Sequence, residues 1–507
     1  MKNILIFSVN NDANALEYAL ENIESGNRVF FLECDVFLRV CQRNRYGNYF
    51  FCKICKKRMN SNIKALGIDK NAELYFLSDI IKNEDIEYAS GFQMDFNSVS
   101  ELKDITYKGA CLGFGAFSSY VTFTRNVMPE ITDSFKKYIF FLLRKELAVY
   151  RALERLQSQY RFDEIIFHNG RFAQYKPFLE FAKMNNIDYI STEFRRVDGK
   201  WLRDNFINDI PHSITYVANN VLRNWEMGSP GNRVKIGRSF FEKRKNGLPA
   251  GDDNRVYVKN QHLGELPTGW SNDVENIVIF NSSEDEYLAV NRDYDNNLLF
   301  PNQFTALKTI FEHYKNDNTK HFYLRIHPNL KDVPFKSHVG LYRLKYPNVT
   351  IVPADSSISS YSLLDQSDKV IIFDSTMGVE AEYWGKPVIA LTKYFYWPLG
   401  MLHHPNTIDE VWDLIDRKDL KAQSTDNIIK YGYWMMVQNY PEFSKVPYKY
   451  LHFKAFGREY TDYSIMSLLG SYKLYTLFER GIDKLHCISL FKKLPCTEPY
   501  QESNGKV

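Results

Sequence analysis

The chain has 507 residues, 44% of them apolar, and carries a net charge of +3 from 64 basic and 61 acidic side chains. This length exceeds one typical hydrophobic core, so we expect two or more domains, and the near balance of charge argues against nucleic acid as a partner. No window offers the roughly 18 uncharged apolar residues that a membrane-spanning helix needs. The apolar run near the N-terminus is too short for a secretion signal, and we therefore expect a cytoplasmic protein with reduced cysteines.

Strand and helix patterns alternate over the first half of the chain. Apolar runs predict strands at 3–8, 28–33, 164–167 and 188–191, and helical spacing predicts helices at 12–22 and 133–157. A cysteine-bearing insert (34–55) and a mostly helical insert separate the second of these strands from the third. The pattern indicates one α/β domain over residues 1–236.

A second alternating series follows a stretch rich in Gly, Pro, Asn and Asp, which we interpret as a linker over residues 237–273. The series predicts strands at 276–280, 321–326, 349–352, 370–373 and 388–391, with helices at 303–314 and 357–365. It indicates a second α/β domain over residues 274–430. The remaining residues, 431–507, are predicted to form a helical tail that packs back on the first domain or contacts a membrane surface.

The segment from Val370 to Leu391 is the most informative single unit of the second series. A buried strand leads into Asp374, Ser375 and Thr376, which can cap a short helix, and Gly385-Lys386-Pro387 then leads into the next strand. Backbone N–H groups at the start of such a helix favour anions. The unit is therefore typical of a site for a phosphate-bearing ligand.

Polar residues also follow two other strands of this domain. Asn281 to Tyr287 come after the first strand and include Ser283 and Glu286, while Arg325-Ile326-His327-Pro328 ends the next. Proline biases His327 toward an extended backbone, which aims its imidazole away from a helix face. Polar residues end strands in many proteins because loops are wet, but three matching strand ends favour a nucleotide or phosphate site.

Two doubly wound, Rossmann-like domains that face each other across a cleft, with a helical insert and a helical tail, form the architecture called GT-B. Ligands bind such sheets beyond the carboxyl ends of the strands. We therefore expect a mixed α/β protein of GT-B architecture with its ligands in that cleft.

Six sequence motifs carry a resemblance that covers most of the chain. They are RIHPNL (325–330), DSTMGVEAEYWGKPV (374–388), KYFYWPLGM (393–401), IIFHNGRFA (165–173), EFRR (193–196) and PHS (211–213). With them the chain resembles bacterial glycosyltransferases of surface and capsule polysaccharide synthesis, including the capsule Kdo-transferase type. The resemblance implies that His327, Ser375 and Thr376 hold the phosphate of a nucleotide sugar. It makes Glu380 a ribose ligand, although a solvated helix carboxylate is an equal alternative.

Glycosyl transfer needs a general base near the acceptor hydroxyl, and phosphate can be stabilised by His327 and backbone N–H groups without a metal cofactor. The first domain offers Glu193, Asp12 and His168 at strand ends, and we choose Glu193 as the base. An ion pair of Glu193 with Arg195 or Arg171 is the structural alternative.

The acceptor side of the predicted cleft would be formed by residues of the first domain. Arg171 can bind a carboxylate of the acceptor or donor. Asn169 and His212 complete the residues that we expect to contact the acceptor.

Four of the seven cysteines fall within one window: Cys34, Cys41, Cys52 and Cys55. Four thiolates can hold a structural zinc ion, and Cys52-x-x-Cys55 is a usual half-site for zinc. The spacing of Cys34 and Cys41 is unusual, so free thiols are the main alternative. A redox pair and an iron–sulfur cluster fit less well.

Residues 472–493 of the tail carry five basic residues against two acidic ones on a partly amphipathic pattern. Such a helix can lie on an anionic membrane surface, although most helices of this kind pack with a wet basic face. If it binds lipid, the protein acts at the inner face of the cytoplasmic membrane.

These observations predict an inverting glycosyltransferase that moves a sugar from a nucleotide donor, favoured as a CMP-linked acidic sugar. The acceptor would be a saccharide or lipid-linked saccharide of a growing capsule, lipopolysaccharide or O-antigen. A non-hydrolysing nucleotide-sugar epimerase is one alternative, because it shares the two-domain architecture and a similar Ser-x-Gly-x-Glu turn. A non-catalytic scaffold of a polysaccharide assembly complex is another.

Overall fold

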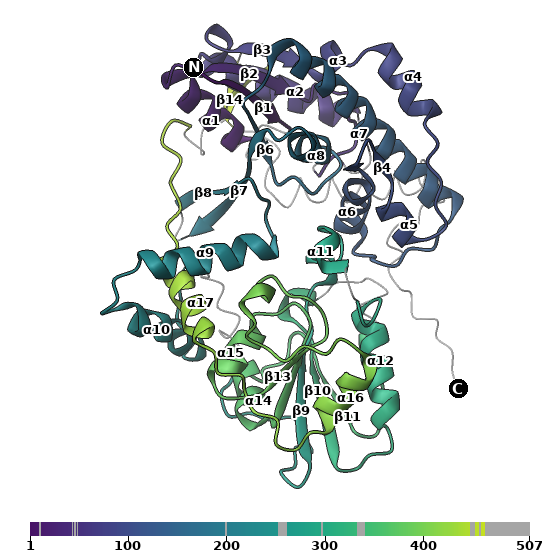
Figure 1. Ribbon diagram of the computed structural model, residues 1–507, viewed down its shortest axis with the longest axis vertical. Helices are drawn as coiled ribbons and strands as arrows, with labels where there is room; N and C mark the ends of the chain where they lie inside the picture. The colour runs from purple at the N-terminus through teal and green to yellow at the C-terminus, as the bar shows by residue number, and fades with distance from the viewer. Residues whose placement is uncertain are drawn as a thin grey trace. The chain divides into compact units, whose positions relative to one another are not determined.

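The computed structural model describes residues 1–9, 12–42, 44, 47, 49–197, 200–251, 261–295, 298–331, 340–446, 452–455 and 458–461. These residues form two compact units (Figure 1). Unit 1 contains residues 1–124, 128–211 and the described residues from 440 onward, and unit 2 contains residues 125–127 and the described residues of 212–439. Each unit is a mixed α/β domain built on a largely parallel sheet, so the predicted fold class of two doubly wound domains, as in GT-B proteins, is confirmed.

Unit 1 is built on a six-stranded sheet with the order β3-β2-β1-β6-β7-β8. The strands are β1 (Asn3–Ser8), β2 (Arg28–Glu33), β3 (Glu73–Phe76), β6 (Glu164–His168), β7 (Asp188–Val197) and β8 (Lys200–Ile207). All pairs are parallel except β7 with β8. The register places Ser8 opposite Glu33 and His168 opposite Thr192, so the carboxyl ends of the four central strands lie at one edge.

The helices of unit 1 cover both faces of this sheet, and those between β2 and β6 form the predicted inserts. They are α1 (Ala13–Glu24), α2 (Tyr49–Ala65), α3 (Leu77–Ile80), α4 (Asn83–Gly91), α5 (Val99–Lys103), α6 (Gly113–Thr124), α7 (Asp133–Tyr160) and α8 (Lys176–Met184), with a small hairpin of β4 (Thr106–Tyr107) and β5 (Ala110–Cys111). Ile4 and Ile6 pack against α1 and α2, whereas Phe7, on the opposite face, stacks on Phe178 of α8. Helices therefore cover both faces of the sheet, so apolar side chains are buried on either side of the central strands.

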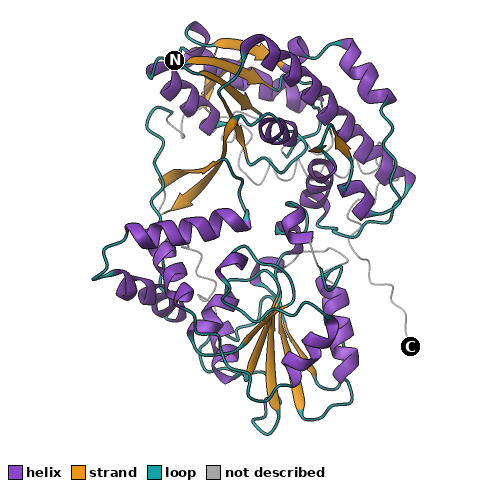
Figure 2. Ribbon diagram, in the orientation of Figure 1, coloured by secondary structure: helices purple, strands orange, loops and turns teal. Residues whose placement is uncertain are grey.

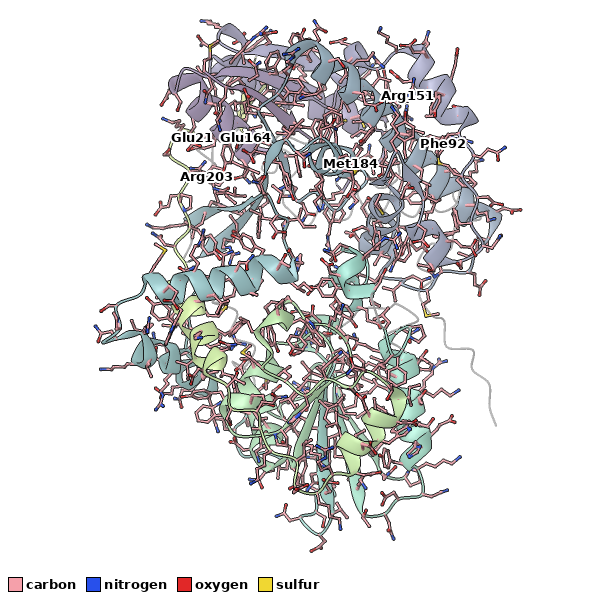
Figure 3. All side chains as sticks on the ribbon, in the orientation of Figure 1. Glu21, Phe92, Arg151, Glu164, Met184 and Arg203 are labelled. Atoms are coloured by element: carbon pink, nitrogen blue, oxygen red, sulfur yellow. The ribbon has the colours of Figure 1, made fainter. Side chains whose placement is uncertain are left out.

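An ion pair fixes the edge strand β8 to helix α1. Arg203 of β8 places its two terminal nitrogens 2.7 and 2.9 Å from the carboxylate oxygens of Glu21 (Figure 3). This bidentate geometry is the strong form of an arginine–carboxylate contact. It ties an antiparallel strand, which the sequence patterns did not predict, to the first helix of the domain.

Unit 2 is built on a five-stranded parallel sheet with the order β11-β10-β9-β12-β13 (Figure 2). The strands are β9 (Glu275–Phe280), β10 (Lys320–Arg325), β11 (Val349–Val352), β12 (Lys369–Ile372) and β13 (Val388–Ala390). Val278 and Phe280 face a core cluster shared with α10 and α17, while Ile277 and Ile279 face one shared with α12 and α16. Both faces of the sheet are buried, as the continuous apolar runs predict.

The helices of unit 2 are α9 (Ile214–Met227), α10 (Arg233–Lys245), α11 (Arg292–Asp295), α12 (Gln303–Tyr314), α14 (Ser360–Gln366), α15 (Met377–Tyr383), α16 (Ile408–Asp416) and α17 (Asp426–Val437). Three short 3-10 turns, η3 (Glu284–Glu286), η4 (Pro328–Leu330) and η5 (Trp397–Leu399), follow the strands β9, β10 and β13. The chain passes from unit 1 to unit 2 at residue 212 instead of the predicted residue 237, and α10 occupies the start of the predicted linker. The physical reason is that α9 and α10 pack on α17 of unit 2.

The described part of the tail differs from the helical prediction. After α17 the chain returns to unit 1, as expected, but two strands, β14 (His452–Ala455) and β15 (Arg458–Thr461), pair antiparallel there. The predicted basic helix at 472–493 lies outside the described residues. In the part of the chain that the structure describes, no helix is both long and apolar enough to cross a membrane.

Candidate functional site

The strand order of unit 2 identifies the place where a ligand would bind. From β9 the chain continues to β10 and β11 on one side and then returns to β12 and β13 on the other. At such a reversal the connections leave in opposite directions, so a crevice opens beyond the carboxyl ends of the two central strands. Here those strands are β9 and β12. They are followed by two of the polar segments described above, residues 281–287 and 374–376.

Hydrogen bonds tie the three strand-end loops of unit 2 together. The backbone N–H of His327, after β10, donates to Asn281 Oδ1 at 2.7 Å, and the N–H of Asp374, after β12, donates to Ser282 Oγ at 3.2 Å. Asn281 and Ser282 directly follow β9 and were not among the predicted ligands. Their position immediately after a buried strand is the sequence feature from which this bridging role could have been predicted.

The orientation of the His327 ring follows from the turn that Pro328 begins. The N–H of Asn329 donates to His327 Nδ1 at 3.1 Å. Because Nδ1 accepts a hydrogen bond, the neutral ring carries its proton on Nε2. Nε2–H is then the ring's donor toward an anionic ligand.

The turn after β12 is held from the neighbouring β13 loop. Asp374 Oδ1 accepts the N–H of Phe395 at 3.0 Å, and the hydroxyl of Tyr396 donates to the carbonyl of Ser375 at 2.7 Å. Both aromatic residues belong to the KYFYWPLGM motif and had no predicted role at the site. Helix α15 is only seven residues long, so an anion here would depend on the turn's side chains and N–H groups more than on the helix dipole.

Asp374 sits in a setting that favours its neutral form. Burial, with a smaller contribution from the negative charge of Glu286, raises the pKa of Asp374 to about 7, against the opposing effect of the Phe395 N–H. Glu286 itself is exposed at the end of η3, and Ser283 Oγ donates to Asp285 Oδ1 at 2.8 Å. A carboxyl group that is partly protonated near pH 7 reduces repulsion of a bound phosphate.

Two predicted donor ligands, Arg325 and Glu380, have structural contacts instead. Arg325 is 1% exposed, and its guanidinium donates to the carbonyls of Pro353 and Ser356 on the loop after β11. Arg325 is the last residue of β10. Side chains alternate between the two faces of a strand, and that of Arg325 points into the interior of unit 2.

Glu380 is fully buried on α15, and neither the ribose-ligand prediction nor the solvated-carboxylate alternative describes it. Its Oε1 accepts Arg244 Nε at 3.0 Å, and its Oε2 accepts the hydroxyl of Tyr361. Both oxygens therefore hold α10 and α14 to α15. The sequence could not show this, because Arg244 is 136 residues away along the chain.

Unit 1 has its own chain reversal, between β1 and β6, and three predicted catalytic residues lie there. His168 Nε2, at the end of β6, is 3.6 Å from Glu193 Oε2 on β7. Asp12 caps α1 by accepting the N–H of Asn14 at 3.0 Å, and it lies near both residues. Burial raises the pKa of Asp12, the charge of Glu193 adds to the shift, and His168 opposes it. The structure thus brings Glu193, Asp12 and His168 together.

Asn169 orients the glutamate of this group. It has a left-handed backbone (φ 57°), and its side-chain amide donates to Glu193 Oε1 while its Oδ1 accepts the N–H of Arg171 at 3.2 Å. Asparagine tolerates this backbone better than most residues. Arg195 pairs with Asp204 on β8, so the alternative pairing of Glu193 with Arg195 is not formed.

The remaining predicted acceptor residues are placed differently. The guanidinium carbon of Arg171 lies 4.6 Å from the ring centre of Phe172. His212 is exposed in unit 2, where its carbonyl accepts the hydroxyl of Tyr294 at 2.9 Å. His212 therefore belongs to a different unit from Asn169 and Arg171.

Glu33, at the end of β2, is a buried carboxyl group that the sequence analysis did not select. It is 2% exposed, and within the part of the chain that the structure describes neither carboxylate oxygen has a hydrogen-bond partner. Burial raises its pKa to about 9, with Lys56 lowering it and Asp35 raising it. The sequence feature that could have predicted this buried carboxyl group is a charged residue at the end of the apolar run RVFFLE.

The four clustered cysteines lie around the end of β2 and the first turns of α2. Burial is the main cause of a raised pKa at Cys34, and the other three thiols act on it. Among the described residues, however, no group of three or more His, Cys, Asp or Glu side chains is arranged to hold a metal ion. The structural zinc ion stays a prediction without support from this geometry.

A comparison with protein-family models matches part of the chain. Residues 289–429 match the family described as capsule polysaccharide biosynthesis protein. The resemblance predicted from the motifs is thereby confirmed for this segment. It contains His327, Ser375 and Thr376 but not the candidate residues of unit 1.

Comparison with solved structures gives distant likenesses. The chain is 15% identical to the β Kdo 2,4 transferase KpsC of Thermosulfurimonas dismutans, with a TM-score of 0.34 over 61% of this chain and 87% of that one. It is 12% identical to S. aureus MnaA in a UDP co-structure (TM-score 0.24, 86% and 94% covered). For the glycosyltransferase SsfS6 of Streptomyces sp. SF2575, complexed with thymidine diphosphate, the identity is 9% (TM-score 0.24, 86% and 96% covered). At these values the likenesses support no statement about activity, and a search of curated proteins found no match.

Proposed function

We propose that the protein is a glycosyltransferase of cell-surface polysaccharide synthesis that uses a nucleotide-activated sugar, with a CMP-linked acidic sugar as the favoured donor. The observation that carries the proposal is the hydrogen-bonded junction of three strand ends in unit 2, which presents His327 beside the Ser375-Thr376 turn. The family match to residues 289–429 includes all three of these residues. The proposed acceptor is a saccharide or lipid-linked saccharide at the inner face of the cytoplasmic membrane.

In the proposed reaction, the acceptor hydroxyl oxygen attacks the anomeric carbon as the bond from that carbon to the nucleotide phosphate breaks. The phosphate leaves with the bonding electron pair, and its charge is stabilised by the Nε2–H of His327 and by the hydroxyl and N–H donors of the 375–376 turn. Attack from the face opposite the leaving group inverts the anomeric configuration. No metal cofactor is needed for these steps.

The hydroxyl proton would pass to the group that contains Glu193. A base needs hydrogen-bond reach of the hydroxyl and a fixed orientation, and Asn169 supplies the orientation here. His168 Nε2 lies 3.6 Å from Glu193 Oε2, and Asp12 lies near both residues. We therefore keep Glu193 as the proposed base.

A thermal-shift panel of CMP, CDP, UDP, GDP and ADP tests the donor site. A nucleotide that binds only the folded protein raises the melting temperature, and we expect CMP to give the largest shift. His327→Ala should abolish that shift. The matched control is His262→Ala, since His262 is an exposed histidine of unit 2 that pairs with Glu265.

Other outcomes would change the proposal in specific ways. If UDP gave the largest shift, the proposed donor would be a UDP-linked sugar instead of a CMP-linked one. The epimerase alternative would then gain support, and analysis of the reaction products would distinguish it from sugar transfer. The absence of any shift would favour the scaffold alternative. An equal loss of CMP binding in both histidine variants would remove His327 from the donor site.

A further inference from the structure

The loop that joins α9 to α10 exposes an unusual combination of side chains. Met227, the last residue of α9, is 80% exposed, and Val234, near the start of α10, is 44% exposed. Also on α9, Leu222 is 42% exposed. Large apolar side chains at such exposure on both sides of one short loop have no role in the core of unit 2.

The inner faces of α9 and α10 pack in the core of unit 2. Gly237, Phe240 and Phe241 of α10 and Val217 and Val221 of α9 are buried in the core of unit 2. Figure 1 shows both helices beside α17, with their connecting loop at the outer edge of that layer. Leu222, Met227 and Val234 are not part of this core and remain exposed.

Basic residues surround the exposed apolar ones. Arg223, Lys235 and Arg238 are exposed on the outward faces of α9 and α10, and the guanidinium of Arg233 lies 4.3 Å from the ring centre of Trp225. Glu226 is the acidic residue among them between 222 and 238. The loop thus combines an apolar tip with an excess of positive charge.

We propose that this α9–α10 tip is a docking surface for an anionic lipid membrane. Three apolar side chains are too few for a stable protein interface, which buries about 800 Å² on each partner. They suit shallow insertion among lipid headgroups, and the basic residues supply the complementary charge for an anionic leaflet. The surface lies in the described part of the chain and is independent of the basic segment at 472–493.

The test is flotation of the full chain with phosphatidylcholine vesicles, with and without phosphatidylglycerol, in the absence of nucleotide and acceptor. We expect binding only when phosphatidylglycerol is present, weakening as salt screens the charges. The double variant Lys235→Glu and Arg238→Glu should lower the binding constant by about tenfold or more, since each basic group near an anionic surface contributes substantially. Met227→Ser should also weaken binding.

Two controls match these variants elsewhere on unit 2. Lys345→Glu with Lys418→Glu changes the net charge equally at exposed positions, and Leu263→Ser removes a side chain that is 59% exposed. Both should bind nearly as well as the unaltered protein. Equal losses in test and control variants, or no binding by the unaltered chain, would overturn the proposal.

Two further measurements separate the remaining explanations. If Met227→Ser leaves vesicle binding intact but converts a dimer to a monomer in light scattering, the surface is a contact between copies of the chain. Stabilisation by CMP, measured in solution, should be the same in the charge variant as in the unaltered protein. Failure of the membrane proposal is thus distinguishable from failure of the proposed transferase activity.

Discussion

At the level of single residues, Glu193 and Glu380 show how contacts decide what a carboxylate can do. Both were selected from motifs, but both oxygens of Glu380 are taken up by Arg244 and Tyr361 in a buried site. Glu193 is held by an amide and lies near a histidine, with part of its side chain exposed. An oriented and accessible carboxylate can accept a proton, whereas a buried ion pair serves to join helices.

We predict that Glu193→Gln lowers sugar transfer by about 10²- to 10⁴-fold, the usual contribution of a general base. Nucleotide affinity should not change, because the donor residues belong to unit 2. The measurement is a transfer assay with the donor identified by thermal shift, combined with nucleotide binding. Glu164→Gln is the control, since Glu164 is at the opposite, amino end of β6 (Figure 3). Near-normal turnover of Glu193→Gln would exclude it as the base.

Glu33 gives a prediction about pH. Its folded pKa of about 9 lies above the ordinary value of 4.5, so the folded state binds its proton more tightly than the unfolded state does. The folded state therefore loses stability as the pH rises from about 4.5 to about 9. Glu33→Gln removes this loss, and its melting temperature should exceed that of the unaltered protein increasingly from pH 5 to pH 8.

The control for that experiment is Glu73→Gln on the neighbouring strand. Glu73 is on β3 and pairs with Arg28 at the surface, at 2.6 Å. Its replacement should change the melting temperature little, and by a similar amount at pH 5 and pH 8. A pH-independent effect of Glu33→Gln would show that Glu33 is ionised in the folded protein.

At the level of elements, α10 and α17 pack unusually closely. A Cβ atom on Gly237 would lie 2.4 Å from the carbonyl oxygen of Ile429, and one on Gly432 would lie 2.4 Å from the carbonyl oxygen of Gly237. Neither helix backbone can move aside without disturbing the core beneath. Gly237 and Gly432 therefore allow α10 to lie close to α17. This contact holds α10 to unit 2.

Gly237→Ala should destabilise unit 2 by about 1–3 kcal/mol, the range for overpacking a tight contact. The measurement is chemical denaturation followed by tryptophan fluorescence. Gly231→Ala is the matched control, because a Cβ atom there would meet no atom within 4 Å. A variant at Gly237 as stable as the control would mean that the helices separate at little cost.

At the level of the whole molecule, the chain begins and returns to the same unit. Glu17 of α1 is fully buried and accepts the backbone N–H groups of Ser444, Lys445 and Val446. This contact joins residues more than 420 positions apart in the sequence. It closes unit 1 with a segment that follows the described residues of unit 2 in the sequence.

Glu17→Ala should lower the stability of unit 1 by a few kcal/mol, because hydrogen bonds to a charged group are lost and three N–H groups are left without an acceptor. Glu24→Ala is the control, since it removes only an exposed ion pair with Lys445, worth at most about 1 kcal/mol. Limited proteolysis near residue 440 should accelerate in the first variant and not in the second. Equal cleavage rates would show that other contacts hold this segment.

Much of the fold could be predicted because its signals are local. The runs 3–8 and 28–33 correspond to β1 and β2, and 303–314 to α12, since continuous apolar stretches and helical spacing depend on neighbouring residues. The positions of His327 and Asp374 at strand ends followed for the same reason. The edge strand β8 and the β14–β15 pair were missed, because mixed polar sequences become strands only through their partners.

The sequence by itself determined which residues end the buried strands, and therefore that His327, Asp374, His168 and Glu193 could belong to sites. The tertiary structure decided which polar side chains keep an accessible face. Arg325 and Glu380 became structural because carbonyls, a tyrosine and an arginine from distant segments met them in a low-dielectric interior. A buried charge must be paired, and its partner is set by how the layers pack, which no local sequence pattern encodes.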